Sequence, residues 1–140
     1  MRNVTSGANP HHDWRSRPYK PARLPANCGS RAYVWFTFAL RRGDLVGVRA
    51  AAGELGRDIN LVDALAVVLL TAAHDDDAFD RAATRWLARF VYERPAVGLD
   101  ELRLGVTALE ALPHNPDAAK IVLSELCLRH RLDGVIGLLA

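Results

Sequence analysis

The sequence FDRAATRWLARFV, residues 79–91, decides the fold class. Its apolar residues recur at i, i+3, i+4, i+7, i+8, i+11 and i+12, which is the spacing of one face of an α-helix. They are Phe79, Ala82, Ala83, Trp86, Leu87, Phe90 and Val91. Asp77 precedes the helix with Asp80 three positions on, as is typical of a capped start, and Pro95 follows its end. We therefore predict an amphipathic helix with one buried face.

Two further helices are predicted upstream. Asn60 is placed to cap LVDALAVVLLTAA, residues 61–73, which is apolar around almost its whole circumference. That helix should be the buried centre of the domain. Asp44 precedes the other helix, which Gly56 can end. Its inner stripe recurs at three- and four-residue spacing and comprises Leu45, Val48, Ala52 and Leu55.

Two more helices are predicted downstream. One begins after Gly98, and its inner stripe comprises Leu99, Leu102, Val106 and Leu109. The other opens at Asn115 and Pro116, an N-cap followed by proline at the first helical position, and runs to about Arg131. Its predicted inner face comprises Ile121, Val122, Leu126 and Cys127.

The remaining C-terminal residues 132–140, LDGVIGLLA, are predicted to turn at Asp133 and Gly134 and to fold a short apolar end back onto the body. Short loops between consecutive helices make neighbouring helices antiparallel. We therefore expect a single all-α domain over residues 31–140, built as a compact bundle of five to six antiparallel helices or as stacked helical hairpins. The sequence has no 34-residue period, so we do not expect an array of helical repeats.

Residues 32–40, AYVWFTFAL, are ambiguous between helix and strand. Their aromatic and β-branched side chains favour a strand. However, the chain contains no second convincing strand to pair with, and an isolated strand would leave its backbone groups unsatisfied. A helix ending near Gly43 is therefore favoured, with strand pairing across a dimer as the alternative.

Residues 1–30 are predicted to form a flexible, basic arm rich in proline and arginine. The fixed φ of proline excludes a regular helix through most of this stretch, at Pro10, Pro18, Pro21 and Pro25. Residues 1–31 hold six Arg or Lys against one Asp, whereas residues 32–140 hold twelve against fifteen Asp or Glu. The basic character of the chain therefore belongs to the arm.

The composition limits the class of protein. Half of the 140 residues are hydrophobic and 24% are charged, which is enough for one modest core. Two cysteines, Cys28 and Cys127, exclude the disulfide framework of small secreted proteins. The N-terminal residues lack the apolar region of a signal peptide, and no apolar run is long enough to span a bilayer. We expect a cytoplasmic protein without membrane contact.

Three segments, GDLVGVRAAAGEL, RWLARFVYE and ALEALPHNPDAAKIVLSELCLRH, together resemble small uncharacterised helical proteins of high-GC Gram-positive bacteria. The resemblance covers residues 39–132. That group carries no assigned activity, and the shared motifs are helix caps and apolar stripes. The resemblance therefore implies a helical fold and a cytoplasmic location, and no cofactor, partner or site residue.

Two clusters have residue types that could carry chemistry. Cys127 and His130 lie three positions apart on one helix, as two zinc ligands could, but no further pair of ligands accompanies them. His74 to Asp77, HDDD, lacks the Gly-bearing loop and closing Glu of a cation site, and helix capping accounts for two carboxylates. The sequence has no nucleophile motif or phosphate-binding loop. We predict no catalytic, cofactor or metal site.

Our leading hypothesis is a non-enzymatic helical protein–protein interaction module that associates with itself or with another protein. The apolar content is generous for one domain of this size. The contact surface is predicted to be the aromatic segment 32–40 or the apolar C-terminus, with the residues Tyr33, Trp35, Phe36, Phe38, Ile136, Leu138 and Leu139.

The alternative hypothesis is a small nucleic-acid-associated regulator. The polar side of the helix over 79–91 carries a row at i, i+4 and i+8 that could track phosphates, namely Arg81, Arg85 and Arg89. Asp77, Asp80 and Glu93 are placed to pair with this row, which favours a salt-bridged, solvated face. The arm could bind by charge and by stacking of its aromatic residues, through Arg15, Arg17, Lys20 and Arg23. An enzyme of unrecognised type is the third hypothesis.

Overall fold

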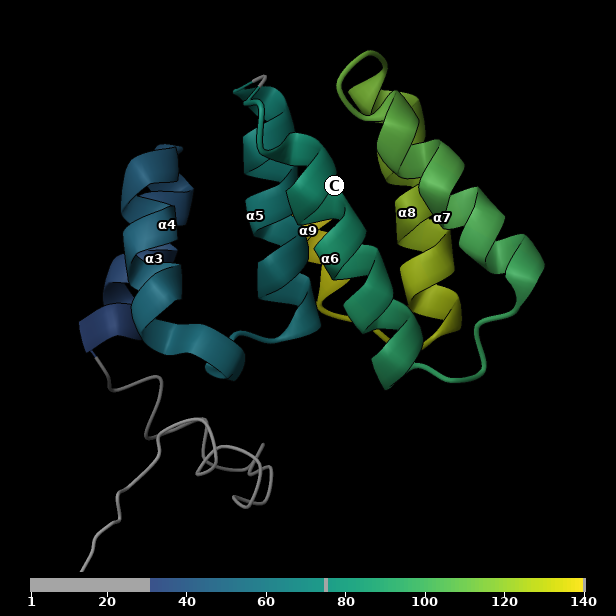
Figure 1. Cartoon of the computed structure of the whole chain (residues 1–140), viewed down its shortest axis with the longest axis horizontal. Coiled ribbons are helices and arrows are strands. Elements are labelled where there is room, and N and C mark those ends of the chain that lie inside the picture. Colours follow the sequence, from purple (N-terminus) through teal and green to yellow (C-terminus); the bar gives the residue numbers. More distant parts are fainter. Residues whose placement is uncertain (1–30, 75, 140) are drawn as a thin grey trace, which may run out of the picture. The chain divides into compact units, whose positions relative to one another are not determined.

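The computed structural model describes residues 31–74 and 76–139, and these residues form α-helices joined by short connections (Figure 1). Both ranges are free of β-strands. The α-helices are α3 (Arg31–Arg42), α4 (Leu45–Leu55), α5 (Leu61–Ala73), α6 (Phe79–Glu93), α7 (Leu99–Ala111), α8 (Pro116–Arg129) and α9 (Val135–Leu139), and α4 leads into a 3-10 turn, η2 (Gly56–Asp58). The predicted all-α class is confirmed, and residues 32–40 are helical.

Helix starts and ends follow local side-chain chemistry. Three predicted N-caps each accept a hydrogen bond from the backbone N–H three residues on, Asp44 at 3.0 Å, Asn60 at 2.8 Å and Asn115 at 3.4 Å. Helix α3 ends at Gly43, whose φ of +69° lies in the left-handed region that glycine adopts without steric cost. Residues 32–40, which could have formed a strand, are therefore helical, and the helix ends in a turn at Gly43 whose N–H donates to the carbonyl oxygen of Leu40.

The predicted cap of α6 is wrong. Asp77 does not cap the helix, because its N-cap residue is Ala78 and no side chain bonds there. Asp76 instead accepts a hydrogen bond from the N–H of Ala78 at 2.8 Å, and its carboxylate also pairs with Arg49 of α4 at 2.8 Å. The turn before α6 therefore forms around Asp76, which pairs with Arg49, and not around Asp77 as predicted.

Buried side chains gather in two clusters that share α5. The main core lies among α5 to α9, and its least exposed members include Leu65, Phe90, Leu123, Leu126 and Val135. The smaller cluster joins α3, α4 and the turn that follows, through Phe36, Ala39, Val48, Ala51, Leu55 and Ile59, and side chains of α5 pack against it. Helix α5 contacts α3, α4, α6 and α9, as expected of the buried centre.

Helix α7 buries only part of its predicted stripe, since Leu109 is buried and Leu102 packs against the main core. Leu99 is 70% exposed and Val106 39%, whereas Gly105, Ala108 and Leu109 are buried. A Cβ at Gly105 would lie 3.0 Å from Leu87 of α6 and 3.4 Å from Leu126 of α8, so the missing side chain allows close approach. The small residues Gly105 and Ala108 therefore form part of the contact, whereas Leu99 and Val106 are exposed.

Two predictions for the C-terminal part need correction and one is confirmed. Ile121 was expected on the inner face of α8 and is exposed, because Ala119 and Leu123 fill the contact. The helix ends at Arg129 rather than Arg131, since Arg131 adopts a left-handed φ of +67°. The apolar end does fold back as α9, with Val135 and Leu139 buried.

Candidate functional site

The outer side of α3 carries exposed apolar side chains. Val34, Trp35 and Phe38 are 53%, 65% and 56% exposed, and we call them the α3 face. The opposite side of the same helix carries Phe36 and Ala39, which are buried in the smaller cluster. Helix α3 is therefore anchored by one apolar side and presents a second one to solvent.

The other predicted contact residues are distributed differently. Phe36 and Leu139 fill the chain's own core instead of reaching the surface. Tyr33 is partly buried, and its hydroxyl donates a hydrogen bond to Asp63 Oδ2 at 3.4 Å. Leu138 is half-buried against the main core. At the C-terminus only Ile136 remains more than half exposed among the described large hydrophobic residues, so the α3 face is the larger of the two predicted surfaces.

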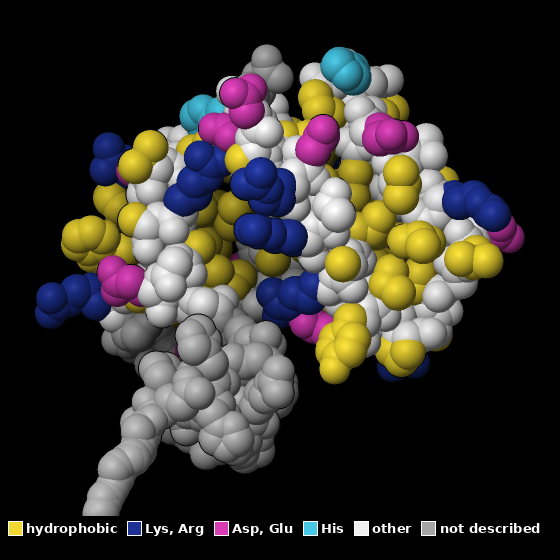
Figure 2. Space-filling model, viewed as in Figure 1, with side chains coloured by type: hydrophobic (Ala, Val, Ile, Leu, Met, Phe, Trp, Pro, Cys, Tyr) yellow, Lys and Arg dark blue, Asp and Glu magenta, His cyan; other side chains and the backbone are white. Residues whose placement is uncertain are grey.

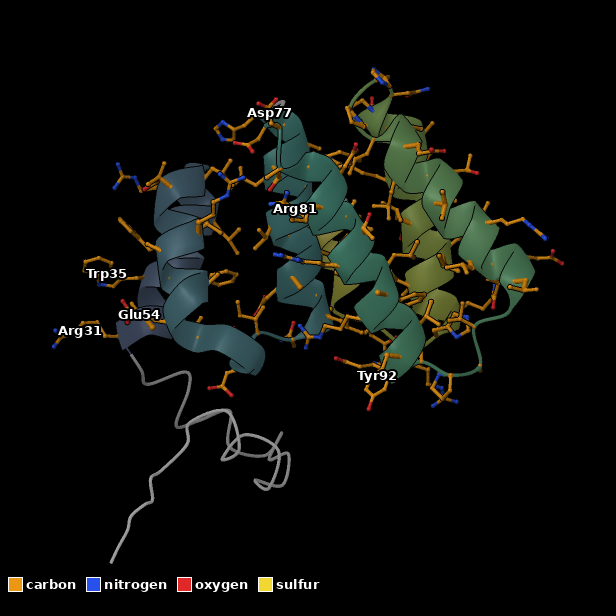
Figure 3. All side chains as sticks on the ribbon, viewed as in Figure 1. Arg31, Trp35, Glu54, Asp77, Arg81 and Tyr92 are labelled. Atoms are coloured by element: carbon orange, nitrogen blue, oxygen red, sulfur yellow. The ribbon has the colours of Figure 1, made fainter. Side chains whose placement is uncertain are left out.

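Charges of both signs surround the α3 face. The guanidinium of Arg42 lies 5.3 Å from the ring centroid of Phe38, in a cation–π contact. Arg31 of α3 and Glu54 of α4 are exposed on the same side as Trp35, as Figure 3 shows. Neither Arg31 nor Glu54 forms an ion pair with another residue in the described part of the chain. This surface therefore has an apolar centre with unpaired charge at its margin.

A second apolar surface lies over α7, where Figure 2 shows hydrophobic side chains gathered. It includes Leu99 and Val106, which fall on one side of the helix at about 100° per residue and which we call the α7 face. The sequence pattern missed this surface because it assigned Leu99 and Val106 to the core. The face contains no aromatic residue, and Val106 is only 39% exposed.

Helix α6 carries the predicted arginine row, Arg81, Arg85 and Arg89, on its polar side. Arg89 donates to Glu93 at 2.5 Å, as the spacing suggested. Asp77 and Asp80 do not pair with the row, so Arg81 and Arg85 are exposed and form no ion pair with any residue in ranges 31–74 and 76–139. Figure 2 shows the basic side chains gathered on this side of α6, and Figure 3 labels Arg81 among them.

The second part of the nucleic-acid hypothesis concerned the N-terminal arm. Its predicted contact residues lie outside the described residues, and they are Arg15, Arg17, Lys20 and Arg23. The role of the arm therefore stays a prediction.

Cys127 and His130 have structural roles in the described chain. Burial raises the pKa of the Cys127 thiol to about 12, which keeps it protonated at neutral pH. His130 Nε2 lies 2.9 Å from Glu101 Oε1, and its ring meets Phe90 edge-on. The hydrogen bond with His130 is the main reason that the pKa of Glu101 is lowered, with a further contribution from Arg129. This network ties α7 to the end of α8.

The HDDD segment joins α5 and α6 to the α3–α4 pair. His74 Nε2 lies 2.9 Å from the carbonyl oxygen of Gly43, and because a carbonyl can only accept, this nitrogen carries the proton. The ion pair with Arg49 lowers the pKa of Asp76. Within the described ranges, no three His, Cys, Asp or Glu side chains are grouped so that they could hold a metal ion.

An open hollow of about 280 Å³ lies between α6 and α7. Its floor is apolar, with Phe79, Leu87 and Leu109, and its rim carries the exposed carboxylates of Asp80 and Glu110. Thr84 also lines the hollow, and its side chain is exposed like the two carboxylates.

None of the described helices combines the length and apolar character needed to cross a bilayer. In comparisons with known proteins, no family model, curated protein or solved structure matches the chain.

Proposed function

We propose that this domain is a protein–protein interaction module that associates with a second copy of itself through the α3 face. The observation that carries the proposal is the exposure of Val34, Trp35 and Phe38 on a helix whose other side is buried through Phe36 and Ala39. Contiguous exposed apolar side chains bounded by polar groups are typical of interaction sites. Aromatic residues, above all tryptophan, supply much of the binding energy at such sites.

A second copy fits this face because the charges around it are of both signs. In a two-fold dimer the same patch meets itself, so a basic margin on one protomer can oppose an acidic margin on the other. In Figure 3, Arg31 and Glu54 lie on the same side as Trp35, and neither forms an ion pair in the described part of the chain. Their pairing across the dimer would satisfy both charges while the aromatic rings are buried.

The α3 face is a better candidate than the α7 face or the C-terminus. The α7 face has no aromatic side chain, and Ile136 is the one large hydrophobic residue of the described C-terminal segment that is more than half exposed.

We also propose that the helices are arranged as antiparallel hairpins, which the contacts of α3 with α4, α5 with α6 and α7 with α8 support. The proposal also includes a cytoplasmic location, which the cysteine usage supports.

The proposal is tested by sedimentation velocity of the full chain over a concentration series. The wild type should form a dimer as concentration rises, and Trp35→Asp should remain a monomer because a charge would be buried in the contact. Leu99→Asp is the matched control, since Leu99 is 70% exposed and Trp35 65%.

Circular dichroism should show unchanged helicity in both variants, because both positions are exposed. A wild type that stays monomeric up to its solubility limit would refute self-association. Loss of the dimer in Leu99→Asp but not in Trp35→Asp would move the contact to the α7 face.

A further inference from the structure

The outer side of α6 combines cations with an exposed aromatic ring. At about 100° per residue, Arg81, Arg85, Arg89 and Tyr92 fall within an arc of roughly 80° around the helix. Tyr92 is 87% exposed, so its ring is accessible from solvent. The line from Arg81 to Tyr92 spans eleven residues, about 16 Å at 1.5 Å per residue. We call these four side chains the α6 strip.

The charge of the α6 strip contrasts with the rest of the domain. Residues 31–140 hold thirteen Arg or Lys against fifteen Asp or Glu, so the domain as a whole is slightly acidic. Arg81 and Arg85 nevertheless stand exposed one turn apart, without an ion pair to any described residue. Two free guanidinium groups at this spacing can pair with successive anionic groups of an extended ligand.

We propose that the α6 strip binds single-stranded nucleic acid, with Arg81 and Arg85 on neighbouring phosphates and the Tyr92 ring stacked on a base. Guanidinium groups bind phosphates, as they bind carboxylates, with two parallel hydrogen bonds. An aromatic ring at the end of a basic row is the usual platform for a splayed base. A duplex would leave the ring without a partner, because base faces are already stacked inside it.

The proposal is independent of self-association, because α3 and α6 present different side chains. Residue Trp35 belongs to the α3 face, and the α6 strip is on another helix. The variant Trp35→Asp should therefore bind nucleic acid as the wild type does, apart from avidity gained in a dimer. Failure of one proposal does not imply failure of the other.

The test is fluorescence anisotropy of a labelled oligothymidylate titrated with the full chain at two salt concentrations. The double variant Arg81→Gln/Arg85→Gln should bind at least tenfold more weakly at low salt. Its slope of log K against log salt should fall by about 1.4, since each phosphate contact of a single strand contributes about 0.7. Tyr92→Ala should weaken binding roughly fivefold to a hundredfold through lost stacking.

The matched control is Arg103→Gln on α7. Its side chain is 75% exposed and pairs only with the exposed Asp100, so it removes a surface cation away from the α6 strip. This control should bind as the wild type does. The full chain is used so that binding by other basic segments is present in every sample and cancels in the comparison.

Three results would overturn the proposal. The first is no binding by the wild type at low salt. The second is equal loss in Arg103→Gln and in the double variant, which would make the effect one of overall charge. The third is full competition by polyglutamate together with unchanged binding in Tyr92→Ala, which would assign the α6 strip to acidic proteins instead.

Discussion

At the scale of single residues, two tryptophans of the described chain have opposite roles. Trp86 is 2% exposed, stacks on Phe90 with ring centroids 5.1 Å apart, and donates from Nε1 to the carbonyl of Leu61 at 2.9 Å. Trp35 is 65% exposed and belongs to the α3 face. The same residue type therefore stabilises the main core in one place and is available for a partner in the other.

This difference predicts unequal effects of truncation on stability. Trp86→Ala should lower the free energy of unfolding by about 3–5 kcal/mol, because it leaves a cavity and removes a buried hydrogen bond. Trp35→Ala should change it by less than about 0.5 kcal/mol in the monomer. Urea unfolding followed by circular dichroism measures both. Equal losses would mean that Trp35 is packed in solution.

The carboxylate of Glu101 predicts a dependence of stability on pH. Its pKa is lowered in the folded chain, mainly by His130, so its stabilising contribution is present above the ordinary carboxyl range and is lost as pH falls through the folded pKa. Burial raises the pKa of Asp63, which acts in the opposite direction, because that contribution is present at low pH and lost as pH rises.

We expect Glu101→Gln to be less stable than the wild type at neutral pH and to lose less stability on acidification. Urea unfolding at a series of pH values from neutral to acidic measures this. Glu110→Gln is the control, since Glu110 is exposed and has no ion pair with a described residue. The assignment fails if both variants follow the same pH profile as the wild type.

At the scale of elements, helix starts were predictable and buried faces only in part. Capping is local, so Asp44, Asn60 and Asn115 could be identified from a few residues each. The start of α6 could not be identified in this way. Its turn forms around Asp76, whose carboxylate pairs with Arg49, 27 positions away in the sequence. The face of α7 was assigned only in part: Leu109 is buried as predicted, but periodicity counts large side chains and could not show that Gly105 is in the contact.

Two glycines in helices are expected to respond oppositely to substitution. Gly105→Leu should destabilise the domain by about 1–3 kcal/mol, because the new side chain would enter the space held by Leu87 and Leu126. Gly53→Ala in α4 should stabilise it by about 0.5–1 kcal/mol, since nothing lies within 4 Å of the added Cβ and alanine favours the helix. Thermal unfolding compares the two, and a stable Gly105→Leu would show that α7 is loosely packed.

At the scale of the whole molecule, the candidate surfaces depend on which apolar and charged residues the fold leaves exposed. The sequence predicted the aromatic segment and the arginine row, but it could not tell that Phe36 is buried while Trp35 and Phe38 are exposed. The sequence also did not show that Arg81 and Arg85 form no ion pair with a described residue, because Asp77 and Asp80 were placed to pair with them. Both are consequences of tertiary packing.

The unequal size of the two clusters predicts stepwise opening. Among the described residues, the main core has eighteen buried members and the smaller cluster has six. We expect amide hydrogens of α3 and α4 to exchange faster than those of α5, α6 and α8 in hydrogen-exchange mass spectrometry. Phe36→Ala should widen this difference, because its ring is fully buried in the smaller cluster. Uniform exchange across all helices would indicate a single cooperative unit.

The burial of the Cys127 thiol allows the opening of the main core to be measured by alkylation. It lies fully buried among residues of the main core, and its raised pKa of about 12 leaves almost no thiolate to react with an alkylating reagent. In a Cys28→Ser background, labelling of this one sulfur can proceed only when the main core opens. The rate at which Cys127 is modified would therefore report how often the main core opens.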